Sequence, residues 1–563
     1  MGQSARLLAI LGMTALAGLA CTGSAATGPV EPGGPKVQRV ILAVQPPTTE
    51  ANDPRFGRAP TNWVYWPFYE NMVGIDPATG KLSPQLATEW SLEPNGQAYR
   101  FKIRKGVQFH HGKGEFVAKD VEGVYKSFLE LPELERGYTL WDPIIKEIQV
   151  VNDYELVVQM KKPAGVFMQS FSEQRGTFNI FSPKHFQEVK QPTNDAPNGQ
   201  PTMQSGPAAG TGAYQFKERE QGSYIRYQAV PYQHWRANPD FPEFEFRFVK
   251  EASTRMAGLL TGEVHMADLP EDLKAQSLQR GFKTVAGRVQ ANRAFLQIDC
   301  CFFADINDHS KGWTTPESPL ADPRIRKALN KAVDRDKLSK AFFGGNTQPL
   351  ISTHFRPGLD GWNPQWEKDF AQEYGYDPEA AKRLLAQAGY GPSGRTLQTN
   401  MLFPTDAGRA YAGGDDIADA LAVMWRAIGI DVQHTTIDPV QRTAMTRGLR
   451  LTNHVLLTGT SSEPWTGTTT YGSSAISGAR GSGVELAKAD AALNQLSETL
   501  DEKRTEQFWR IVGDALFYEH KDIPLFYIPV EVVVNQNIVA DWLFPGSITG
   551  GWTHVYNIKA VRR

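Results

Sequence analysis

The sequence has few cysteines, almost no net charge and no long apolar run beyond its N-terminal segment. Its 563 residues include 3 cysteines, too few for the disulfide framework that holds small secreted domains together. The 59 basic and 61 acidic residues nearly cancel, so the chain lacks the electrostatic footprint of a nucleic-acid-binding protein. A spanning helix needs about 20 apolar residues, and no later run reaches that length.

Catalytic and metal-binding motifs are also missing. The sequence has no Gly-x-Ser-x-Gly elbow and no His-Glu-x-x-His helix. Gly112-Lys113 does not complete a phosphate loop, because Val107 stands where its first glycine would be. His110 and His111 are adjacent on an expected strand, so their side chains point to opposite faces and cannot share one ion. We therefore expect no enzyme activity, no cofactor and no metal site.

Two of the three cysteines are adjacent, at Cys300 and Cys301. A bond between neighbouring residues closes a strained eight-membered ring. We therefore expect two partly buried thiols here, with a redox-sensitive vicinal disulfide as the less favoured alternative.

The N-terminus reads as a targeting segment and is set apart from the fold. A basic residue, Arg6, precedes an apolar run from Leu7 to Ala20, and Cys21 follows directly. Leu19-Ala20-Cys21 is similar to a lipoprotein cleavage site, which would make Cys21 the lipidated first residue; ordinary signal cleavage at the small residues nearby stays open. Residues 22–36 are rich in Gly, Ala, Ser and Pro, so we expect a flexible tether.

The segment from Leu82 to Phe128 predicts a hairpin followed by a helix. Pro94-Asn95-Gly96 is turn chemistry, and apolar and basic residues alternate after it from Tyr99 to Arg104. Four residues then repeat at helical spacing, namely Val121, Val124, Tyr125 and Phe128. A dense aromatic stretch precedes this segment, and we expect its rings to be mostly core: Trp63, Tyr65, Trp66, Phe68 and Tyr69.

Later segments predict helices with clear start signals. Asp322-Pro323 and Asp377-Pro378 each place an N-cap before a proline at the first helical position. Residues 486–517 predict two further helices, separated near Asp501.

Five motifs follow one another along the chain. They are Leu-x-Pro-x-Leu-Ala-x-x-Trp from Leu82, Phe-x-Ile-Arg-Lys-Gly-Val-x-Phe-His-x-Gly-Lys from Phe101, Ala-x-Asp-Val from Ala118, Gly-Thr-Gly-Ala-Tyr from Gly210 and DPRIRKALNKAVDRDKL from Asp322. This ordered set resembles the family 5 (peptide/nickel-type) solute-binding proteins of ABC importers. The resemblance implies an α/β protein with a two-lobe periplasmic-binding-protein-like fold of the class II type. It also implies an extra subdomain inserted in lobe one and two chain crossings between the lobes.

The resemblance also supplies the expected domain boundaries. Lobe one is expected at residues 37–62, 207–290 and 530–563, the inserted subdomain at 63–206, and lobe two at 291–529. The signal peptide is expected at residues 1–21 and the tether at 22–36.

Ligand contacts are expected in both lobes. The turn after the first strand, with Thr48, Thr49 and Glu50, matches a ligand-contacting turn of the family. Peptide-binding members often carry Gly-Asp-x-x-Asp-Pro in lobe two, and the first Asp holds the α-ammonium of the peptide. Here Thr460 stands in that place and Glu463 in the second. A hydroxyl offers a weaker, neutral hydrogen bond, which puts free-amine peptides in doubt; a shifted alignment would restore Glu463 as the ammonium partner.

Tryptophan rings supply further candidate contacts, since their faces suit sugar rings, capped peptides or other solutes with apolar bodies. Trp362 and Trp465 are the two that we assign to the site, although core packing is an alternative for each.

The expected function is a periplasmic receptor, lipid-anchored to the membrane, that works as a monomer. It would capture a peptide or similar-sized solute and deliver it to an ABC permease and ATPase complex. Two alternatives are a sensor built on the same fold and an exported hydrolase on another fold. The ligand itself is not predicted.

Overall fold

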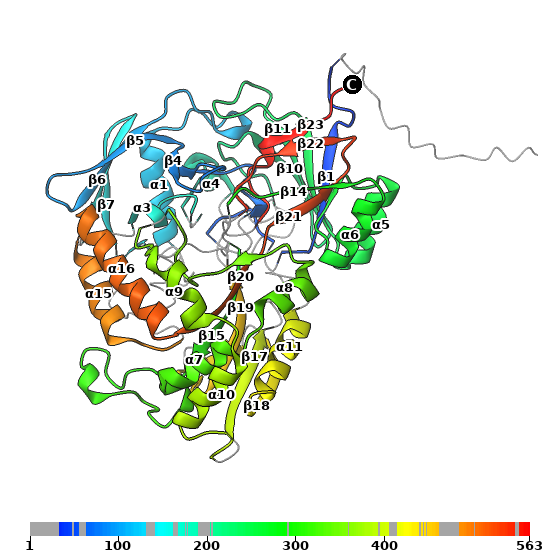
Figure 1. Cartoon of the computed structure of the whole chain (residues 1–563). Helices are drawn as coiled ribbons and strands as arrows, with labels where there is room; N and C mark the ends of the chain where they lie inside the picture. The colour runs from blue at the N-terminus through cyan, green and yellow to red at the C-terminus, as the bar shows by residue number, and fades with distance from the viewer. Residues whose placement is uncertain are drawn as a thin grey trace, which may run out of the picture.

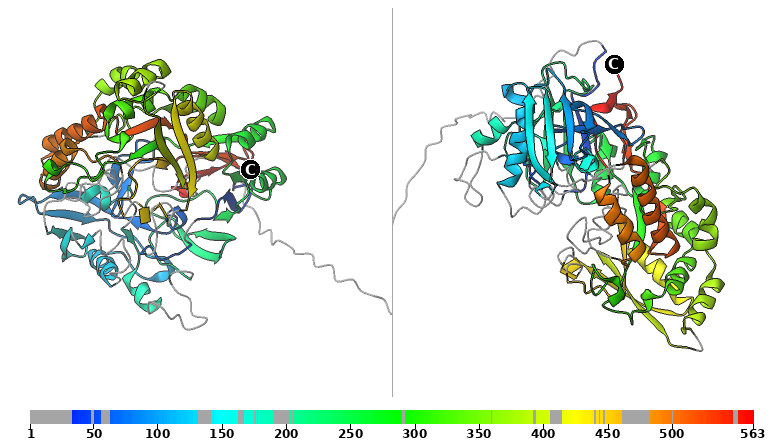
Figure 2. Two further views of the ribbon diagram at one scale, coloured as in Figure 1. Left: turned by 90° about the horizontal axis from the view of Figure 1, so that it is seen from below. Right: turned by 90° about the vertical axis from the view of Figure 1, so that its left-hand side faces the viewer.

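The computed structural model describes most of the chain from residue 33 onward. The residues described are 33–47, 50–55, 63–130, 141–142, 144–161, 167–174, 176, 178–189, 203, 206–289, 292–358, 360–391, 394–404, 414–438, 441–442, 444–445, 448–460, 483–499, 501–546 and 551–563. Two large sheets with separate hydrophobic cores form two lobes, drawn above and below in Figure 1. The right-hand view of Figure 2 shows the same two bodies from the side.

Lobe one is built on a seven-stranded mixed sheet in the order β10-β11-β12-β1-β13-β21-β14. The bounds are β1 (Arg39–Val44), β10 (Tyr214–Glu220), β11 (Tyr224–Ala229), β12 (Glu243–Phe248), β13 (Met266–Ala267), β14 (Lys283–Ala286) and β21 (Glu531–Val534). The central strand β1 is parallel to β12 and β13. Val40, Leu42 and Val44 face the main core, and Ile41 and Ala43 face a second cluster, so β1 is buried on both faces, as central parallel strands are.

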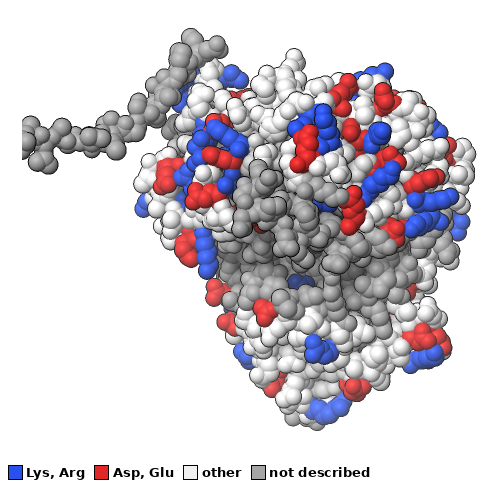
Figure 3. Space-filling model, turned by 180° about the vertical axis from the view of Figure 1, so that it is seen from behind, with Lys and Arg blue, Asp and Glu red and all other residues white. Residues whose placement is uncertain are grey.

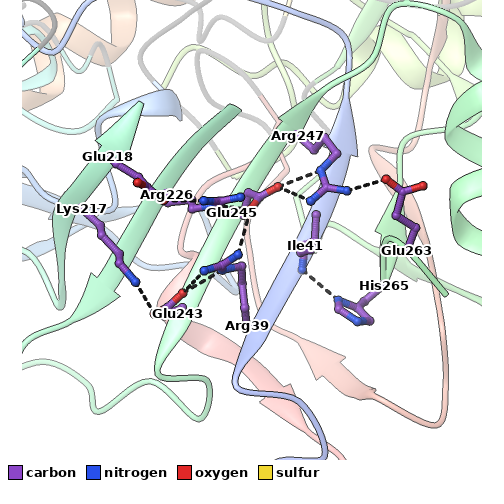
Figure 4. A network of polar contacts seen from close by, with 10 residues as sticks. All are labelled: Arg39, Ile41, Lys217, Glu218, Arg226, Glu243, Glu245, Arg247, Glu263 and His265. Carbon is purple, nitrogen blue, oxygen red and sulfur yellow. Dashed lines mark hydrogen bonds and ion pairs between the residues drawn. The ribbon is translucent and has the colours of Figure 1, made fainter. Parts of the chain in front are cut away.

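Two coverings protect the outer face of this sheet. Beside β1 and β21, helix α5 (Ala252–Thr261) buries Met256 and Leu259 in the second cluster, and α6 (Glu271–Gln279) follows it. Over β10, β11 and β12, ionic side chains take the place of a helix (Figure 4). The carboxylate of Glu245 is fully buried there.

The segment before β10 forms a four-stranded antiparallel sheet in the order β5-β6-β8-β7. Its elements are β5 (Ala87–Leu92), β6 (Ala98–Ile103), β7 (Ile145–Asn152), β8 (Glu155–Met160) and helix α1 (Ala118–Leu129). The predicted hairpin, its Gly96 turn at φ +66° and the helix are confirmed. The five aromatic residues from Trp63 to Tyr69 are buried, as predicted, in one core that this sheet shares with lobe one. The 63–206 boundary of an inserted subdomain stays a prediction.

Shorter elements complete this half. They are β2 (Glu70–Asn71) with β9 (Asn179–Ile180), β3 (Val73–Ile75) with β4 (Leu82–Pro84), β22 (Val539–Trp542) with β23 (Ile558–Ala560), α3 (Phe167–Ser170), α4 (Pro183–Val189), η2 (His110–Gly112) and η6 (Val555–Asn557). His110 and His111 lie in the turn η2, so the expectation of a strand at these residues is wrong. His110 is fully buried, and its Nε2 lies 2.8 Å from the Gly212 carbonyl oxygen.

Lobe two is built on a six-stranded sheet in the order β16-β20-β15-β19-β17-β18. Its strands are β15 (Arg293–Asp299), β16 (Gln348–Pro349), β17 (Leu397–Pro404), β18 (Ile430–Ile437), β19 (His454–Thr460) and β20 (Asp522–Tyr527). Its helices are α7 (Pro323–Lys331), α8 (Arg335–Phe343), α9 (Gln365–Tyr374), α10 (Pro378–Gln387), α11 (Gly414–Arg426), α15 (Ala487–Glu498) and α16 (Glu502–Tyr518), with the short turns η3 (His309–Lys311) and η4 (Pro319–Ala321).

The predicted helix starts in lobe two are confirmed. The Asp322 carboxylate accepts the Arg324 N–H at 2.9 Å, and the Asp377 carboxylate accepts the Ala380 N–H at 2.8 Å. Asp501 caps α16 by accepting the Arg504 N–H at 2.8 Å. In each case the side chain satisfies one of the amides that a helix leaves without an internal partner.

The two adjacent cysteines form a disulfide, so the expectation of two thiols is wrong. Both residues are fully buried at the end of β15. The Cys300 carbonyl accepts the Thr315 hydroxyl at 3.0 Å, and the Cys301 carbonyl accepts the Glu485 N–H at 2.9 Å. The prediction considered only the strain of the eight-membered disulfide ring. In the fold, Thr315 and Glu485 form hydrogen bonds with the backbone of the two cysteines.

Surface charges of both signs are interspersed on the face drawn in Figure 3. This matches the near-zero net charge of −2. Among the described residues, no helix is both long and apolar enough to cross a membrane.

Candidate functional site

The chain passes twice between the lobes, and the two passages run side by side. The first leads from β14 to β15 and the second from β20 to β21. The Ile528 N–H donates to the Asn292 carbonyl at 2.8 Å, and the Gly287 N–H donates to the Val530 carbonyl at 2.9 Å. A pair of adjacent connections of this kind is a hinge that permits one lobe to rotate against the other.

A segment near the C-terminus, at Phe544 and Pro545, forms backbone hydrogen bonds with the first of the two connections. The N–H groups of Arg288 and Val289 donate to the carbonyls of Phe544 and Pro545 at 3.0 and 2.8 Å. A methyl group on Gly287 would lie 2.6 Å from the Gly546 Cα. The two backbone segments therefore approach each other so closely that only glycine fits. The hinge is therefore fixed on its lobe-one side up to Val289.

The turn after β1 is tied to the β10–β11 hairpin. The Glu50 carboxylate lies 3.3 Å from Arg219 Nη1 and accepts the Gly222 N–H at 3.0 Å. Arg219 also donates to Asn52 Oδ1 at 2.6 Å. These contacts show Glu50 bound within lobe one. A contact between Glu50 and a ligand stays a prediction. Thr48 and Thr49 lie outside the described residues.

On the lobe-two side, β15 and β20 carry a buried polar row. The His354 Nε2–H donates to Asp522 Oδ2 at 2.8 Å, and the Phe295 ring packs edge-on against the imidazole. Burial lowers the pKa of His354 to about 4, so the ring is neutral at pH 7. Burial alone would raise the pKa of Asp522, but the charge of Lys521 and the hydrogen bond from His354 outweigh it and lower the pKa below its usual value.

A second carboxyl group lies further along β15. Gln297 Nε2 donates to Asp299 Oδ1 at 2.7 Å. Burial raises the pKa of Asp299 to about 6, well above that of an ordinary aspartate. Within the described chain, no group of three His, Cys, Asp or Glu side chains could hold a metal ion.

Two of the remaining predicted contacts, Trp362 and Thr460, fall in or beside lobe two. Trp362 is partly buried, and its ring meets that of Trp366 at 5.4 Å, next to the cluster formed with α15 and α16. The backbone of Thr460 ends β19, where it pairs with Arg293 of β15. Glu463 and Trp465, like Cys21, lie outside the described residues. The structure thus places Trp362 and Thr460 in the same lobe and leaves their roles as predictions.

The family assignment follows from a direct comparison. The model of the bacterial extracellular solute-binding proteins, family 5, matches residues 81–478, which is more than half of the chain. The chain belongs to this family. The resemblance drawn from the ordered motifs is thereby confirmed.

Curated relatives are about a quarter identical to this chain over the stretch that matches. Di/tripeptide-binding protein 2 of Pseudomonas aeruginosa is 26% identical over 388 residues, covering 65% of this chain and 65% of that protein. The dipeptide-binding protein of Escherichia coli is 24% identical, covering 66% of each. Heme-binding protein A of Haemophilus influenzae is 24% identical, covering 66% of this chain and 64% of that protein. The matches therefore span just under two thirds of these relatives.

Solved family 5 structures share the fold over nearly the whole chain. NikA from Brucella suis, in complex with Fe(III)-EDTA, aligns with a TM-score of 0.73 at 19% identity, covering 92% of this chain and 100% of that one. A dipeptide-binding protein from Pseudoalteromonas sp. SM9913, in complex with Met-Leu, aligns with a TM-score of 0.70 at 18% identity, covering 93% and 100%. The predicted two-lobe α/β fold is confirmed.

Several residues at the junction escaped the sequence analysis. The Gly287–Gly546 contact joins positions that are distant in the chain, and neither glycine has a distinctive sequence context. Asp76 to Gly80 reads as a turn, but its neighbours Val289 and Arg356 cannot be found without the fold.

Proposed function

We propose that this protein captures a peptide or a solute of similar size between its two lobes and presents it, chemically unchanged, to an ABC permease and ATPase complex. The observation that carries the proposal is the paired hinge, because two adjacent connections allow the lobes to close over a ligand. Closure requires that the ligand bind the closed form better than the open one. Family membership supplies the import role, and its named members are binding proteins rather than enzymes.

The proposal places the receptor outside the cytoplasmic membrane, as a monomer held there by a lipid on Cys21. A tether of residues 22–36 would let it reach the permease. No catalytic residue, cofactor or metal ion is assigned to the site.

The ligand class is proposed from Thr460. Relatives are named for di- and tripeptides, glutathione and heme, and solved members hold ligands as different as Met-Leu and Fe(III)-EDTA. A threonine hydroxyl can accept a hydrogen bond from an α-ammonium group, but it carries no negative charge to pair with it, so the contact is weaker than that with a carboxylate. We therefore place neutral or N-capped solutes ahead of free-amine dipeptides.

A thermal-shift panel tests this proposal. N-acetylated dipeptides are expected to raise the melting temperature more than the matching free dipeptides, because only the free forms carry an ammonium group to be paired. Native mass spectrometry of the protein purified from its host identifies any retained solute. Strong stabilisation by free dipeptides would reject the interpretation of Thr460, and turnover of a stabilising ligand would reject a pure receptor.

A further inference from the structure

Two contacts bridge the lobes beside the hinge, and in each a charged side chain of one lobe lies against a glycine of the other. In the first, Arg356 of lobe two meets Gly80 of lobe one. In the second, Glu271 of lobe one meets Gly344 of lobe two. Both glycines have a left-handed backbone, with φ +71° for Gly80 and +58° for Gly344. A side chain is strained in that conformation, so glycine keeps each surface open to close approach.

The Gly80 surface is a rigid turn. Asp76 Oδ1 accepts the N–H groups of Ala78 and Thr79 at 3.1 and 2.8 Å and the Thr79 hydroxyl at 2.9 Å. The Gly80 N–H donates to the Asp76 carbonyl at 2.8 Å, and the Asp76 N–H donates to the Lys81 carbonyl at 2.9 Å. A turn with this many internal hydrogen bonds resists deformation when another group presses on it.

Arg356 and the hinge residue Val289 both contact this turn. A methyl group on Gly80 would lie 3.1 Å from Arg356 Nη2 and 3.2 Å from Val289 Cγ2. Val289 is itself fixed by the 2.8 Å hydrogen bond from its N–H to the Pro545 carbonyl. The guanidinium of lobe two therefore rests on a part of lobe one that does not move with it.

The second contact is fixed to the hinge as well. A methyl group on Gly344, just past α8, would lie 3.3 Å from Glu271 Oε1. The other oxygen, Glu271 Oε2, is 2.5 Å from Lys274 Nζ, which is also 2.5 Å from Glu531 Oε2 at the start of β21. Lys274 is only 9% exposed, so this bridge is poorly screened and holds Glu271 in place.

We propose that Arg356 and Glu271 are positioning residues that together set the angle between the two lobes. Each contact exists only near the observed angle, because one partner moves with lobe two and the other is anchored in lobe one. Their loss therefore lets the lobes separate. The inference rests on the proposed hinge closure, and it adds a control on ligand affinity that touches no ligand, since a shift in the population of the binding-competent form changes the apparent dissociation constant in proportion.

Small-angle X-ray scattering of the ligand-free protein tests the proposal. Arg356→Ala and Glu271→Ala are each expected to increase the radius of gyration, and the double variant is expected to increase it most. Arg383→Ala and Glu379→Ala serve as matched controls, because these side chains are 67% and 68% exposed on α10. A scattering curve of the double variant that superimposes on that of the natural protein would overturn the proposal.

A second variant guards against loss of folding. Gly344→Asn keeps the left-handed backbone, which asparagine tolerates, and inserts a side chain against Glu271. It is expected to widen the lobe angle without deleting a charge, and an unchanged radius of gyration would again count against the two contacts as determinants of that angle. Because no ligand is present in these measurements, their failure leaves solute capture, tested by native mass spectrometry, as a separate question.

Discussion

Glu245 shows at the scale of one residue how lobe one covers a sheet face without a helix. Its carboxylate lies 2.6 Å from Arg226 Nε, 2.7 Å from Arg247 Nη2 and 3.6 Å from Arg39 Nη1 (Figure 4). Removing one member of a buried ionic group costs about 3–5 kcal/mol, because the remaining charges stay buried without compensation. Three arginines meet at this carboxylate, and each has one further carboxylate partner: Glu243 for Arg39, Glu218 for Arg226 and Glu263 for Arg247.

We expect Glu245→Gln to lower the free energy of unfolding by about 3 kcal/mol, the lower end of that range, because the arginine side chains are 20–32% exposed and partly screened. Glu263→Gln is the matched control. Its carboxylate pairs with Arg247 at 2.9 Å but is 68% exposed, so a change below about 1 kcal/mol is expected. Urea unfolding measures both, and equal effects in the two variants would contradict the assignment of Glu245 as the centre of the network.

Single residues were the hardest level to predict from the sequence. Glu50 was correctly placed after the first strand, but its partner Arg219 lies 169 positions away and has no local signature. Cys300 and Cys301 were judged by the strain of an isolated ring, and the hydrogen bonds from Thr315 and Glu485 could not be foreseen. Long-range partners decide both outcomes, and such partners are set by the fold.

Elements were easier to predict, because their signals are local. The caps at Asp322, Asp377 and Asp501 each need only a carboxylate and an amide two or three residues later. The hairpin at Gly96 and the helix after it likewise follow from turn chemistry and apolar spacing. The hinge pairing has no local signal, since Asn292 and Ile528 come from distant segments.

At the element scale, Asp377→Ala is expected to destabilise lobe two by about 1 kcal/mol, because α10 loses its N-cap hydrogen bond to the Ala380 N–H. Asp377→Asn is expected to retain the stability, since asparagine caps about as well as aspartate. Thermal unfolding of the three proteins checks this. A loss in the asparagine variant as large as in the alanine variant would show that charge, rather than capping, is the cause.

At the scale of the whole molecule, the fold and the family were predicted by the order of the motifs and not by periodicity. The spacing of apolar residues predicted individual strands and helices, but it did not predict how they are arranged in space. The family match gave two lobes and two crossings, and the structure has both. The match could not give the lobe angle, because that depends on contacts such as Arg356 with Gly80 that join separate parts of the chain.

Acid stability is a property of the whole molecule, because buried histidines lie in both lobes. Burial lowers the pKa of His110 to about 3 and that of His354 and His554 to about 4, against about 6.5 in an unfolded chain. The unfolded chain therefore binds more protons between about pH 6.5 and pH 4, and stability falls as the pH falls through that window. Asp299, whose pKa is raised to about 6, acts in the opposite direction, as do Asp120 and Asp268, whose pKa burial also raises. Burial lowers the pKa of His265 to about 4, so His265 adds to the effect of the other three histidines.

We therefore expect the melting temperature to fall steadily from about pH 7 to pH 5, with a loss of several kcal/mol, since each unit of pKa shift corresponds to about 1.4 kcal/mol. His110→Gln removes one titrating group and places an amide nitrogen near the position of Nε2, from which it can donate to the Gly212 carbonyl, so the melting temperature of this variant should depend less steeply on pH. Differential scanning fluorimetry across this range measures both slopes. Identical slopes would mean that His110 is not among the groups whose protonation unfolds the protein, and a flat profile for the natural sequence would reject the buried, neutral state of all four histidines.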